Sequence, residues 1–252
     1  MIREYLKPVD ALVHNGVQYL DFLSLLGATL QPSCYLEIGT CEGRSVARFQ
    51  CDVLCIDPKF VIELSPLRDR KRAFFFQMGS DEFFKAHRVR DFFPGGPDIC
   101  FLDGMHRFEY LLRDFINVEA TCHRNSIILM HDCLPSNERM AERVNRLDES
   151  EDISTRSAWT GDVWRILTVL KRHRPDLRVM QLDCGPTGLI AVTNPDPHST
   201  VLSGDYNKMV DEAMNLSLSS LGLSQLWKLF PTIDTSRLAA HPEDVTAIFN
   251  IA

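Results

Sequence analysis

The stretch YLEIGTCEGRSV, at positions 35–46, decides the fold, because it joins a short apolar run to a glycine-containing loop. Gly39 and Gly43 allow the backbone to turn tightly and to approach a bound molecule closely. Similar apolar runs alternate with helical patterns through the middle of the chain, which is typical of βαβ units around a parallel sheet. The stretch therefore predicts a ligand site at the carboxyl end of the first strand of an open sheet.

The pattern predicts an α/β fold with a seven-stranded, mostly parallel sheet and helices on both faces. The expected strands are 34–38, 52–57, 73–78, 98–102, 126–131, 178–183 and 188–193, and the expected helices are 44–50, 80–89, 107–122, 136–147 and 162–173. The turn residues CGPTG separate the last two strands, so we expect the last strand to be antiparallel.

Three regions follow from this pattern. Residues 1–32 are expected to form an N-terminal helical cap, 33–194 the ligand-binding core, and 195–252 a helical appendage extra to the sheet. The appendage is expected to act as a lid or a dimer element, or simply to pack on the core. The apolar face of the N-terminal helix, which should end near Gly27 and Pro32, is formed by Val9, Leu12, Val13, Val17, Leu20 and Leu23.

Composition narrows the class of protein. A chain of 252 residues with 45% hydrophobic residues can bury one good core. A net charge of −7 and a pI near 5.6 disfavour nucleic acid as a partner. No apolar run approaches the ~20 residues of a membrane-spanning helix, and the N-terminus lacks the features of a signal peptide. We therefore expect a cytoplasmic protein with no membrane partner.

The pattern E-x-G-x-x-x-G-x-S at 37–45 resembles the cofactor loop of class I S-adenosylmethionine (SAM)-dependent methyltransferases. Within that family it resembles the metal-dependent small-molecule O-methyltransferases of the catechol and caffeoyl-coenzyme A types. The macrocin type, which has acidic metal ligands after the later strands, is a nearer relative by resemblance, although its ligand pattern is not reproduced in full. A dinucleotide fingerprint would require glycine at positions 41 and 44, where cysteine and arginine stand. The resemblance implies a Rossmann-like fold and SAM binding by Glu37, Gly39, Thr40, Gly43 and Ser45.

Two further positions extend the expected cofactor site. Asp57 ends the second strand, twenty residues beyond Glu37, where a carboxylate can accept both ribose hydroxyls. The alternative for Asp57 is that it merely begins a turn with Pro58. By the same resemblance Ser80 or Asp81 would meet the adenine edge, although either residue could instead cap the following helix.

Polar side chains follow the fourth and fifth strands directly. Asp103, His106, His131 and Asp132 should meet at one sheet edge, where carboxylate oxygens and imidazole nitrogens suit a divalent metal. The alternative is loop capping by the same side chains. The resemblance implies Asp103, His131 and Asp132 as ligands, although His131 stands where the family has a carboxylate. Magnesium or manganese is expected, with iron or zinc as alternatives.

The resemblance also assigns chemistry to His106, which replaces the lysine general base of the catechol-type enzymes. An imidazole with an unperturbed pKa near 6.5 suits proton removal, so Asp103 and His106 are the expected catalytic residues. His106 could instead join the metal shell. Trp159 is expected to line an acceptor pocket.

These features predict metal-assisted O-methyl transfer to a small hydroxylated acceptor, such as a sugar or a phenolic natural product. One alternative is a non-haem iron oxygenase on the same sheet, held by two histidines and a carboxylate. Another is a non-catalytic cofactor-binding module, since fold alone does not establish activity. A homodimer through the N-terminal helix or the C-terminal tail is a further expectation.

Overall fold

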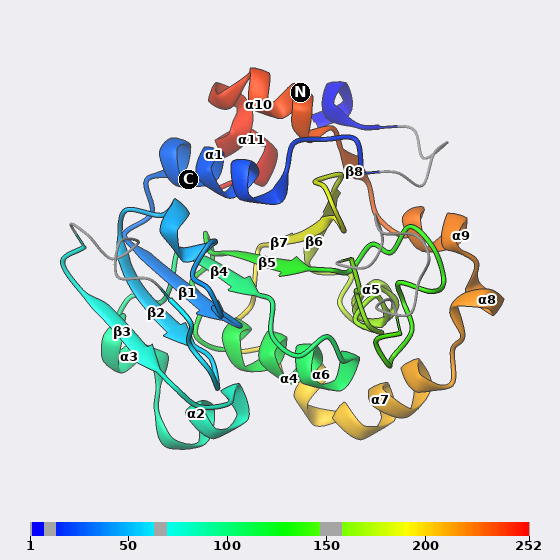
Figure 1. The fold of residues 1–252 in the computed structure, drawn as a ribbon, viewed down its shortest axis with the longest axis horizontal. Helices are drawn as coiled ribbons and strands as arrows, with labels where there is room; N and C mark the ends of the chain where they lie inside the picture. The colour runs from blue at the N-terminus through cyan, green and yellow to red at the C-terminus, as the bar shows by residue number, and fades with distance from the viewer. Residues whose placement is uncertain (1, 8–13, 63–69, 147–157, 252) are drawn as a thin grey trace.

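A computed structural model describes residues 2–7, 14–62, 70–146 and 158–251. Its centre is an eight-stranded sheet in the order β3-β2-β1-β4-β5-β7-β6-β8 (Figure 1). The strands are β1 (Cys34–Ile38), β2 (Asp52–Ile56), β3 (Ala73–Phe76), β4 (Ile99–Leu102), β5 (Ile127–His131), β6 (Arg178–Leu182), β7 (Leu189–Thr193) and β8 (Thr232–Ile233). The expected α/β, Rossmann-like fold is confirmed.

Strand directions follow the prediction with one addition. The strands from β3 across to β5 are parallel, and β7 is antiparallel to both of its neighbours. The tail was expected to be extra to the sheet, and this is wrong. Thr232 and Ile233 form β8, which pairs with Gln181 and Leu182 of β6 and makes the sheet eight-stranded.

Alternate strand residues point to opposite faces, so the sheet separates two apolar cores. Leu36, Leu54 and Leu102 belong to one core, whereas Tyr35, Val53 and Phe101 belong to the other. The first core is covered by α2 (Ser80–Ala86), α3 (Val89–Phe92), α4 (Phe108–Glu119), α5 (Arg165–His173), α6 (Val201–Gly204), α7 (Tyr206–Met214), α8 (Leu218–Leu221) and α9 (Leu223–Trp227). The second core is covered by α1 (Tyr19–Leu30), α10 (Thr235–Ala240) and α11 (Val245–Phe249).

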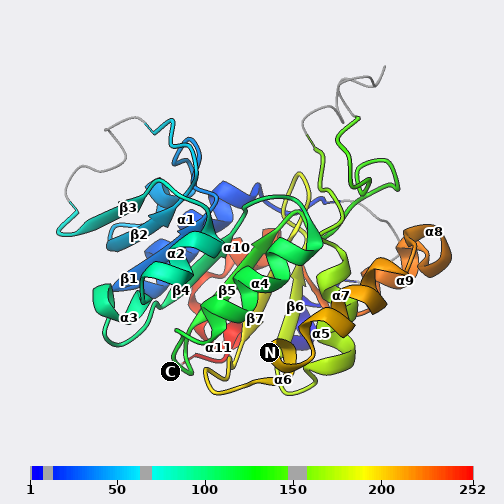
Figure 2. The ribbon, with the colours of Figure 1, turned by 90° about the horizontal axis from the view of Figure 1, so that it is seen from below.

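Figure 2 shows α4 in front of the sheet and α1 and α10 behind it, so helices cover both faces as expected. Short 3-10 turns occur at η1 (Ile2–Tyr5), η2 (Val46–Arg48) and η6 (Pro242–Asp244). Helix α1 packs against α10 and α11, so the N-terminal helix and the end of the tail share one face. None of the described helices is long and apolar enough to cross a membrane. The proposed three-part division and the homodimer stay predictions.

The N-terminal helix begins later than the sequence predicts. It starts at Tyr19, and positions 9–13 of its expected apolar face lie outside the described residues. Ahead of it, the Gly16 N–H donates to the Asp183 carbonyl at 3.1 Å, and the Tyr19 N–H donates to the Gly185 carbonyl at 3.0 Å. Because these backbone groups bind the β6–β7 connection, the arm before Tyr19 does not continue the helix.

Two other predicted helices are replaced by turns. The helix expected at 44–50 is reduced to η2. The helix expected at 136–147 does not form in its described part, residues 136–146. There the Met140 carbonyl accepts hydrogen bonds from the Thr160 N–H and hydroxyl, both at 2.9 Å, and the Glu142 carbonyl accepts one from Trp159 Nε1 at 2.6 Å. These carbonyls are therefore unavailable to a helix.

The remaining helices differ mainly at their ends. The stretch expected at 80–89 is divided into α2 and α3, because His87 and Arg88 adopt extended backbone conformations. Helix α4 is shorter than 107–122 at both ends, and α5 begins at Arg165 after a turn. Because β1, β2, β4 and β5 are parallel, their carboxyl ends lie at the same end of the sheet.

Candidate functional site

The loop after β1 is pressed against the loop after β4. Gly39 has a φ of +88°, and its N–H donates to the Ile56 carbonyl at 2.9 Å. A Cβ at Gly39 would lie 2.0 Å from the carbonyl oxygen of Asp103, which no side chain tolerates. Only glycine combines this backbone conformation with this approach. The glycine that identified the loop therefore brings the expected cofactor residues next to the expected catalytic ones.

Four of the expected cofactor residues belong to the interior of the loop after β1 and do not line the cavity described below. Glu37 is fully buried and accepts a hydrogen bond from the Ser45 hydroxyl, so Ser45 does not cap the following turn. Burial raises the pKa of Glu37 to about 8. The Gly43 N–H donates to the Thr40 carbonyl at 2.8 Å. The Thr40 hydroxyl is buried and has no hydrogen-bond partner among the described residues.

A cavity of about 550 Å³ opens above the loop, within the range of ~300–1,000 Å³ that is typical of small-molecule sites. Its wall brings together the ends of β1, β2 and β4 with the starts of α2 and α4. The polar and glycine residues of this wall are Gly39, Cys41, Asp57, Gly79, Ser80, Asp81, Asp103, Gly104, His106, Tyr110 and Asp114. Glu37, Thr40, Gly43 and Ser45 lie outside the described wall.

Asp57 faces this cavity and also fixes the loop after β1. Its Oδ2 accepts a hydrogen bond from the Cys41 N–H at 2.8 Å, and its Oδ1 accepts one from the Lys59 N–H at 2.7 Å. A carboxylate oxygen can accept two hydrogen bonds, so each oxygen retains capacity for a ribose hydroxyl. The turn at Pro58 and a ligand-facing carboxylate are thus compatible in one residue.

Ser80 and Asp81 begin α2 at the far wall of the cavity. The N-cap of α2 is Gly79, so the alternative in which Ser80 or Asp81 caps the helix is wrong. The carboxylate of Asp81 accepts two hydrogen bonds from Arg113 of α4, both at 2.8 Å. Arg113 also donates to the Tyr206 hydroxyl at 2.7 Å, which connects this wall to the tail.

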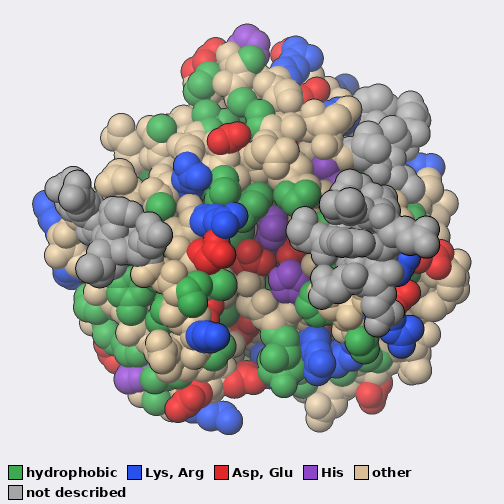
Figure 3. All heavy atoms as spheres, viewed as in Figure 1, with side chains coloured by type: hydrophobic (Ala, Val, Ile, Leu, Met, Phe, Trp, Pro, Cys, Tyr) green, Lys and Arg blue, Asp and Glu red, His purple; other side chains and the backbone are tan. Residues whose placement is uncertain are grey.

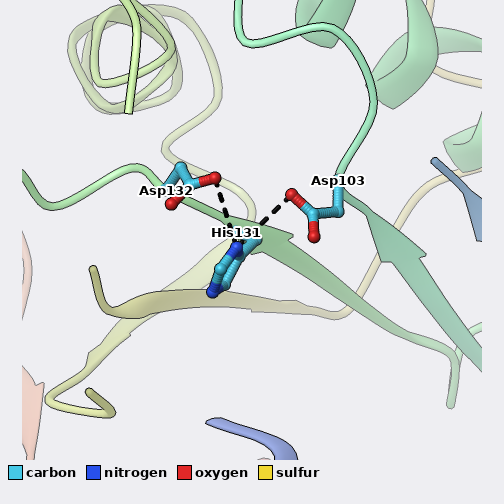
Figure 4. Close-up of side chains that lie close together, drawn as sticks. All are labelled: Asp103, His131 and Asp132. Atoms are coloured by element: carbon cyan, nitrogen blue, oxygen red, sulfur yellow. Dashed lines mark ion pairs between the residues drawn. The ribbon is translucent and has the colours of Figure 1, made fainter. Parts of the chain in front are cut away.

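Acidic and imidazole groups meet at the ends of β4 and β5. His131 Nδ1 lies 3.3 Å from Asp103 Oδ1 and 3.2 Å from Asp132 Oδ2, with the two carboxylates on either side of the ring (Figure 4). Asp132 has a φ of +59°, a left-handed conformation that aspartate tolerates better than most residues. In Figure 3, histidine and acidic side chains gather in a hollow near the middle of this face.

His106 completes the cluster from the loop after β4. Its Nε2 lies 3.1 Å from Asp132 Oδ2 and 3.7 Å from Asp103 Oδ1, and its Nδ1 lies 2.9 Å from the Trp159 carbonyl oxygen. The His106 and Trp159 rings stack with centroids 5.1 Å apart. A Cβ at Gly161 would overlap the His106 carbonyl, so this glycine lets the Trp159 segment lie against the loop.

The carboxylates control the charge of both imidazoles. Burial lowers the pKa of His106, but the nearby carboxylates of Asp103 and Asp132 outweigh it and raise the pKa to about 9. Burial likewise opposes charge on His131, and Asp132 and Asp103 raise its pKa well above the usual range. Burial would raise the pKa of Asp103, but the two histidines hold it below its usual range. In the metal-free protein the histidines therefore carry protons that offset the carboxylates.

The donor set fits a divalent metal. One ligand atom each from Asp103, His131 and Asp132 lies within 4.8 Å of the others. His131 Nδ1 is buried, and neither of its short contacts has hydrogen-bond geometry, so it has no hydrogen-bond partner within the described chain. The opposite nitrogen, Nε2, lies 3.4 Å from the Thr187 hydroxyl, the kind of contact that orients a metal-bound imidazole.

The structure adds residues that the sequence analysis missed. Asp114 lines the cavity from α4. The Tyr19 and His131 rings pack together with their centroids 4.3 Å apart, and Thr187 contacts His131 from the β6–β7 connection. Asp114 could have been noticed, because it stands among apolar residues on the buried face of its helix. Tyr19 and Thr187 had no comparable pattern. Trp159 contacts His106 but lies outside the described cavity wall.

Comparisons with known proteins give a similarity of fold. No protein-family model and no curated protein matches the chain. Among solved structures, the SAH-bound methyltransferase PaMTH1 from Podospora anserina is 14% identical, covering 71% of this chain and 78% of that chain, with a TM-score of 0.47. The O-methyltransferase from Bacillus cereus in complex with SAH is 15% identical, covering 69% of this chain and 79% of that chain, with a TM-score of 0.45. Cofactor-bound Rv0187 from MTB is 17% identical, covering 71% and 80%, with a TM-score of 0.48. At these identities, and with TM-scores below 0.5, the comparisons assign neither a function nor a residue to this chain.

Proposed function

We propose that this protein transfers a methyl group from SAM to a hydroxyl oxygen of a small molecule, with a divalent metal beside the acceptor. One observation carries the proposal: the loop after β4 lines both the cavity and the acid and imidazole cluster. Asp103 and His106 belong to both, so a methyl donor in the cavity would lie next to an acceptor at the cluster. Holding two reactants together in this way is a large part of catalysis of a bimolecular reaction.

The donor side would hold the nucleoside part of SAM. Asp57 offers carboxylate oxygens to the ribose, and the absence of a side chain at Gly39 keeps the loops after β1 and β4 in contact. The sequence resemblance over 37–45 supports the same cofactor. Glu37 and Ser45 would act indirectly, because both are buried beneath the loop.

Asp103, His131 and Asp132 would hold the metal. When bound, a divalent metal lowers the pKa of an acceptor hydroxyl. An imidazole ligand beside two carboxylates is compatible with manganese, iron or zinc as well as magnesium. The acceptor class, a sugar or a phenolic natural product, is part of this proposal.

His106 would receive the acceptor proton. Its Nδ1–H donates to the Trp159 carbonyl. With a metal ion in place of its own proton to offset Asp103 and Asp132, the ring would be neutral and would present the lone pair of Nε2 toward these carboxylates. The acceptor O–H bond breaks and its proton moves to Nε2, while the oxygen forms a bond to the methyl carbon. The carbon–sulfur bond breaks with its electron pair going to sulfur, which leaves as a neutral thioether. The neighbouring carboxylates stabilise the protonated ring.

Calorimetric titration with S-adenosylhomocysteine (SAH) tests the cofactor site. Wild type should bind SAH, and Gly39→Ala should abolish binding because a Cβ would collide with the Asp103 carbonyl. Asp57→Ala, a milder change, should weaken binding by about 10- to 100-fold through loss of charged hydrogen bonds. Gly95→Ala is the matched control, since a Cβ there meets no atom within 4 Å. Absence of SAH binding by folded wild type would refute the proposal.

A non-haem iron oxygenase is the second candidate, because His106 Nε2 lies only 3.1 Å from Asp132 Oδ2. Both histidines and one carboxylate could then form a two-histidine, one-carboxylate iron site. Metal analysis after anaerobic purification separates the two functions. Stoichiometric iron without SAH binding would favour the oxygenase, whereas SAH binding without iron would exclude it.

A further inference from the structure

Helix α4 places a buried carboxyl, that of Asp114, at the wall of the cavity and also beside the acid and imidazole cluster. Asp114 is 3% exposed, and its Oδ1 has no hydrogen-bond partner among the residues that the structure describes. The residue nevertheless forms part of the cavity wall. A buried polar atom without a partner costs free energy, which a ligand that donates a hydrogen bond would recover. Asp114 therefore keeps one acceptor oxygen that no group of the described chain uses, in a residue of the cavity wall.

Gly104 leaves the approach to this carboxyl open. A Cβ at Gly104 would lie 3.5 Å from Ile38 Cγ2 and 3.6 Å from Asp114 Oδ2. Those are ordinary contact distances, so an alanine would fit, whereas a longer side chain would fill the space in front of the carboxyl. The bare backbone at Gly104 thus allows the side chain from α4 to reach a ligand past the loop after β4.

The neighbouring carboxyl is already engaged. Asp81 stands at the same wall, but its carboxylate accepts two hydrogen bonds from Arg113. Burial is the largest cause that raises the pKa of Asp114 to about 7, and the charge of Asp81 acts in the same direction. Ser80, through a hydrogen bond, and the charge of Arg113 act in the opposite direction and only partly offset this rise. Of the two carboxyl groups at this wall, Asp114 is therefore the one with an unused oxygen.

The position of Asp114 matches the base of a bound nucleoside. Asp57 follows β2, while Gly79 and Ser80 follow the adjacent strand β3. A nucleoside with its ribose at Asp57 would direct its base along the wall toward Ser80 and Asp114. Adenine carries a donor, the 6-amino group, at the edge where Asp114 carries an acceptor.

We propose that Asp114 accepts a hydrogen bond from the 6-amino group of the adenine of SAM and selects adenine over 6-oxo purines. This assignment rests on the proposed function and deepens it. Above about pH 7, where Asp114 is ionised, a 6-oxo purine would present an oxygen acceptor to it, so two acceptors would face each other in a buried site. Charged hydrogen bonds in such sites are strong enough to give discrimination of about 10- to 100-fold.

The test compares SAH with its deaminated analogue, S-inosylhomocysteine, by calorimetric titration at about pH 8, where Asp114 is mostly ionised. Wild type should bind SAH about 10- to 100-fold more tightly than the analogue. Asp114→Asn keeps the shape of the side chain, and its amide can present either an acceptor or a donor. We expect this variant to bind the two ligands within about threefold of each other. Asp114→Ala should lose affinity for SAH itself.

Glu119→Gln is the matched control, because Glu119 is a buried carboxylate on the same helix that pairs with Arg174 outside the cavity. It should lower thermal stability and leave the ratio of the two affinities unchanged. If wild type binds SAH and Asp114→Asn keeps the wild-type ratio of the two affinities, the role of Asp114 is refuted and the proposed function is not. If folded wild type binds neither ligand, both the proposed function and the role of Asp114 are refuted.

Discussion

The two sides of the cavity are built on different principles. On the side of β1 and β2, the carboxyl groups accept hydrogen bonds from neutral groups of the chain: Glu37 accepts one from the Ser45 hydroxyl, and each oxygen of Asp57 accepts one from a backbone N–H. At the ends of β4 and β5, Asp103 and Asp132 face two imidazoles and little else. On the first side neutral donors of the chain hold the carboxyl groups, whereas the second side requires bound cations, either protons or a metal ion.

Electrostatic repulsion explains why the cluster at the ends of β4 and β5 must bind a cation. The ligand atoms of Asp103, His131 and Asp132 lie within 4.8 Å of one another. Two like charges at that separation repel by about 3–4 kcal/mol at an effective dielectric constant of about 20. Such repulsion within a folded core favours any cation that can enter. The comparison therefore predicts that the two sides respond differently to mutation and to pH.

The largest effect is expected from Asp132→Asn. This change removes one carboxylate from the cluster and leaves the cavity wall intact, because Asp132 is not part of that wall. Manganese affinity should fall by more than about 100-fold, since loss of a ligand should cost at least as much as loss of a supporting contact. SAH affinity should stay within about threefold of wild type. Manganese binding followed by electron paramagnetic resonance, with calorimetry for SAH, measures both.

Asp91→Asn, a change at an exposed position on α3, is the control and should affect neither ligand. Unchanged manganese affinity in Asp132→Asn would remove the metal from the proposed function. A parallel loss of SAH binding would show instead that the two sides are not independent.

The second effect is the pH dependence of metal binding. The pKa of His106 is raised to about 9 and that of His131 lies well above its usual range, so both rings are protonated near neutral pH without metal. A metal must displace the proton on His131 Nδ1. Affinity for manganese should therefore rise with pH, by about tenfold per unit for each proton released, between about pH 6 and 8. Titrations across this range that show constant affinity would contradict the protonated cluster.

Much of this arrangement could be predicted from the sequence. Apolar runs followed directly by polar residues located Asp103, His106, His131 and Asp132 at one sheet edge, since parallel strands end together. The glycine pattern located the loop after β1. These predictions succeed because strand periodicity and backbone conformation are local properties of the sequence.

Other features depend on contacts that are distant in sequence. Residues 136–146 carry a helical pattern, but the Met140 carbonyl binds Thr160 instead. The pair Thr232 and Ile233 is too short to show strand periodicity, although it pairs with β6. Asp114 is hidden in an apolar helix face, and its role depends on the missing side chain at Gly104. Local patterns cannot specify such partners.

The smallest effect is expected from Glu37→Gln, on the side where neutral donors of the chain hold the carboxyl groups. Burial raises the pKa of Glu37 from 4.5 to about 8, so the folded protein keeps this carboxyl protonated where the unfolded chain ionises it. The stability that this group contributes is therefore present below about pH 4.5 and is lost as pH rises through about 8. The free energy of unfolding of wild type should fall by at most about 1.4 kcal/mol per pH unit in this window.

The glutamine keeps an acceptor for Ser45 and does not titrate, so urea unfolding of this variant should lack that slope and should exceed wild type in stability above about pH 8. Glu42→Gln, at an exposed position of the same loop, should retain the wild-type slope. Metal binding strengthens with pH at the cluster, whereas the loop beneath the cofactor cavity loses stability with pH. If the free energy of unfolding has the same pH dependence in wild type and in Glu37→Gln, then Glu37 is ionised in the folded protein. The side of β1 and β2 would in that case also hold an uncompensated charge.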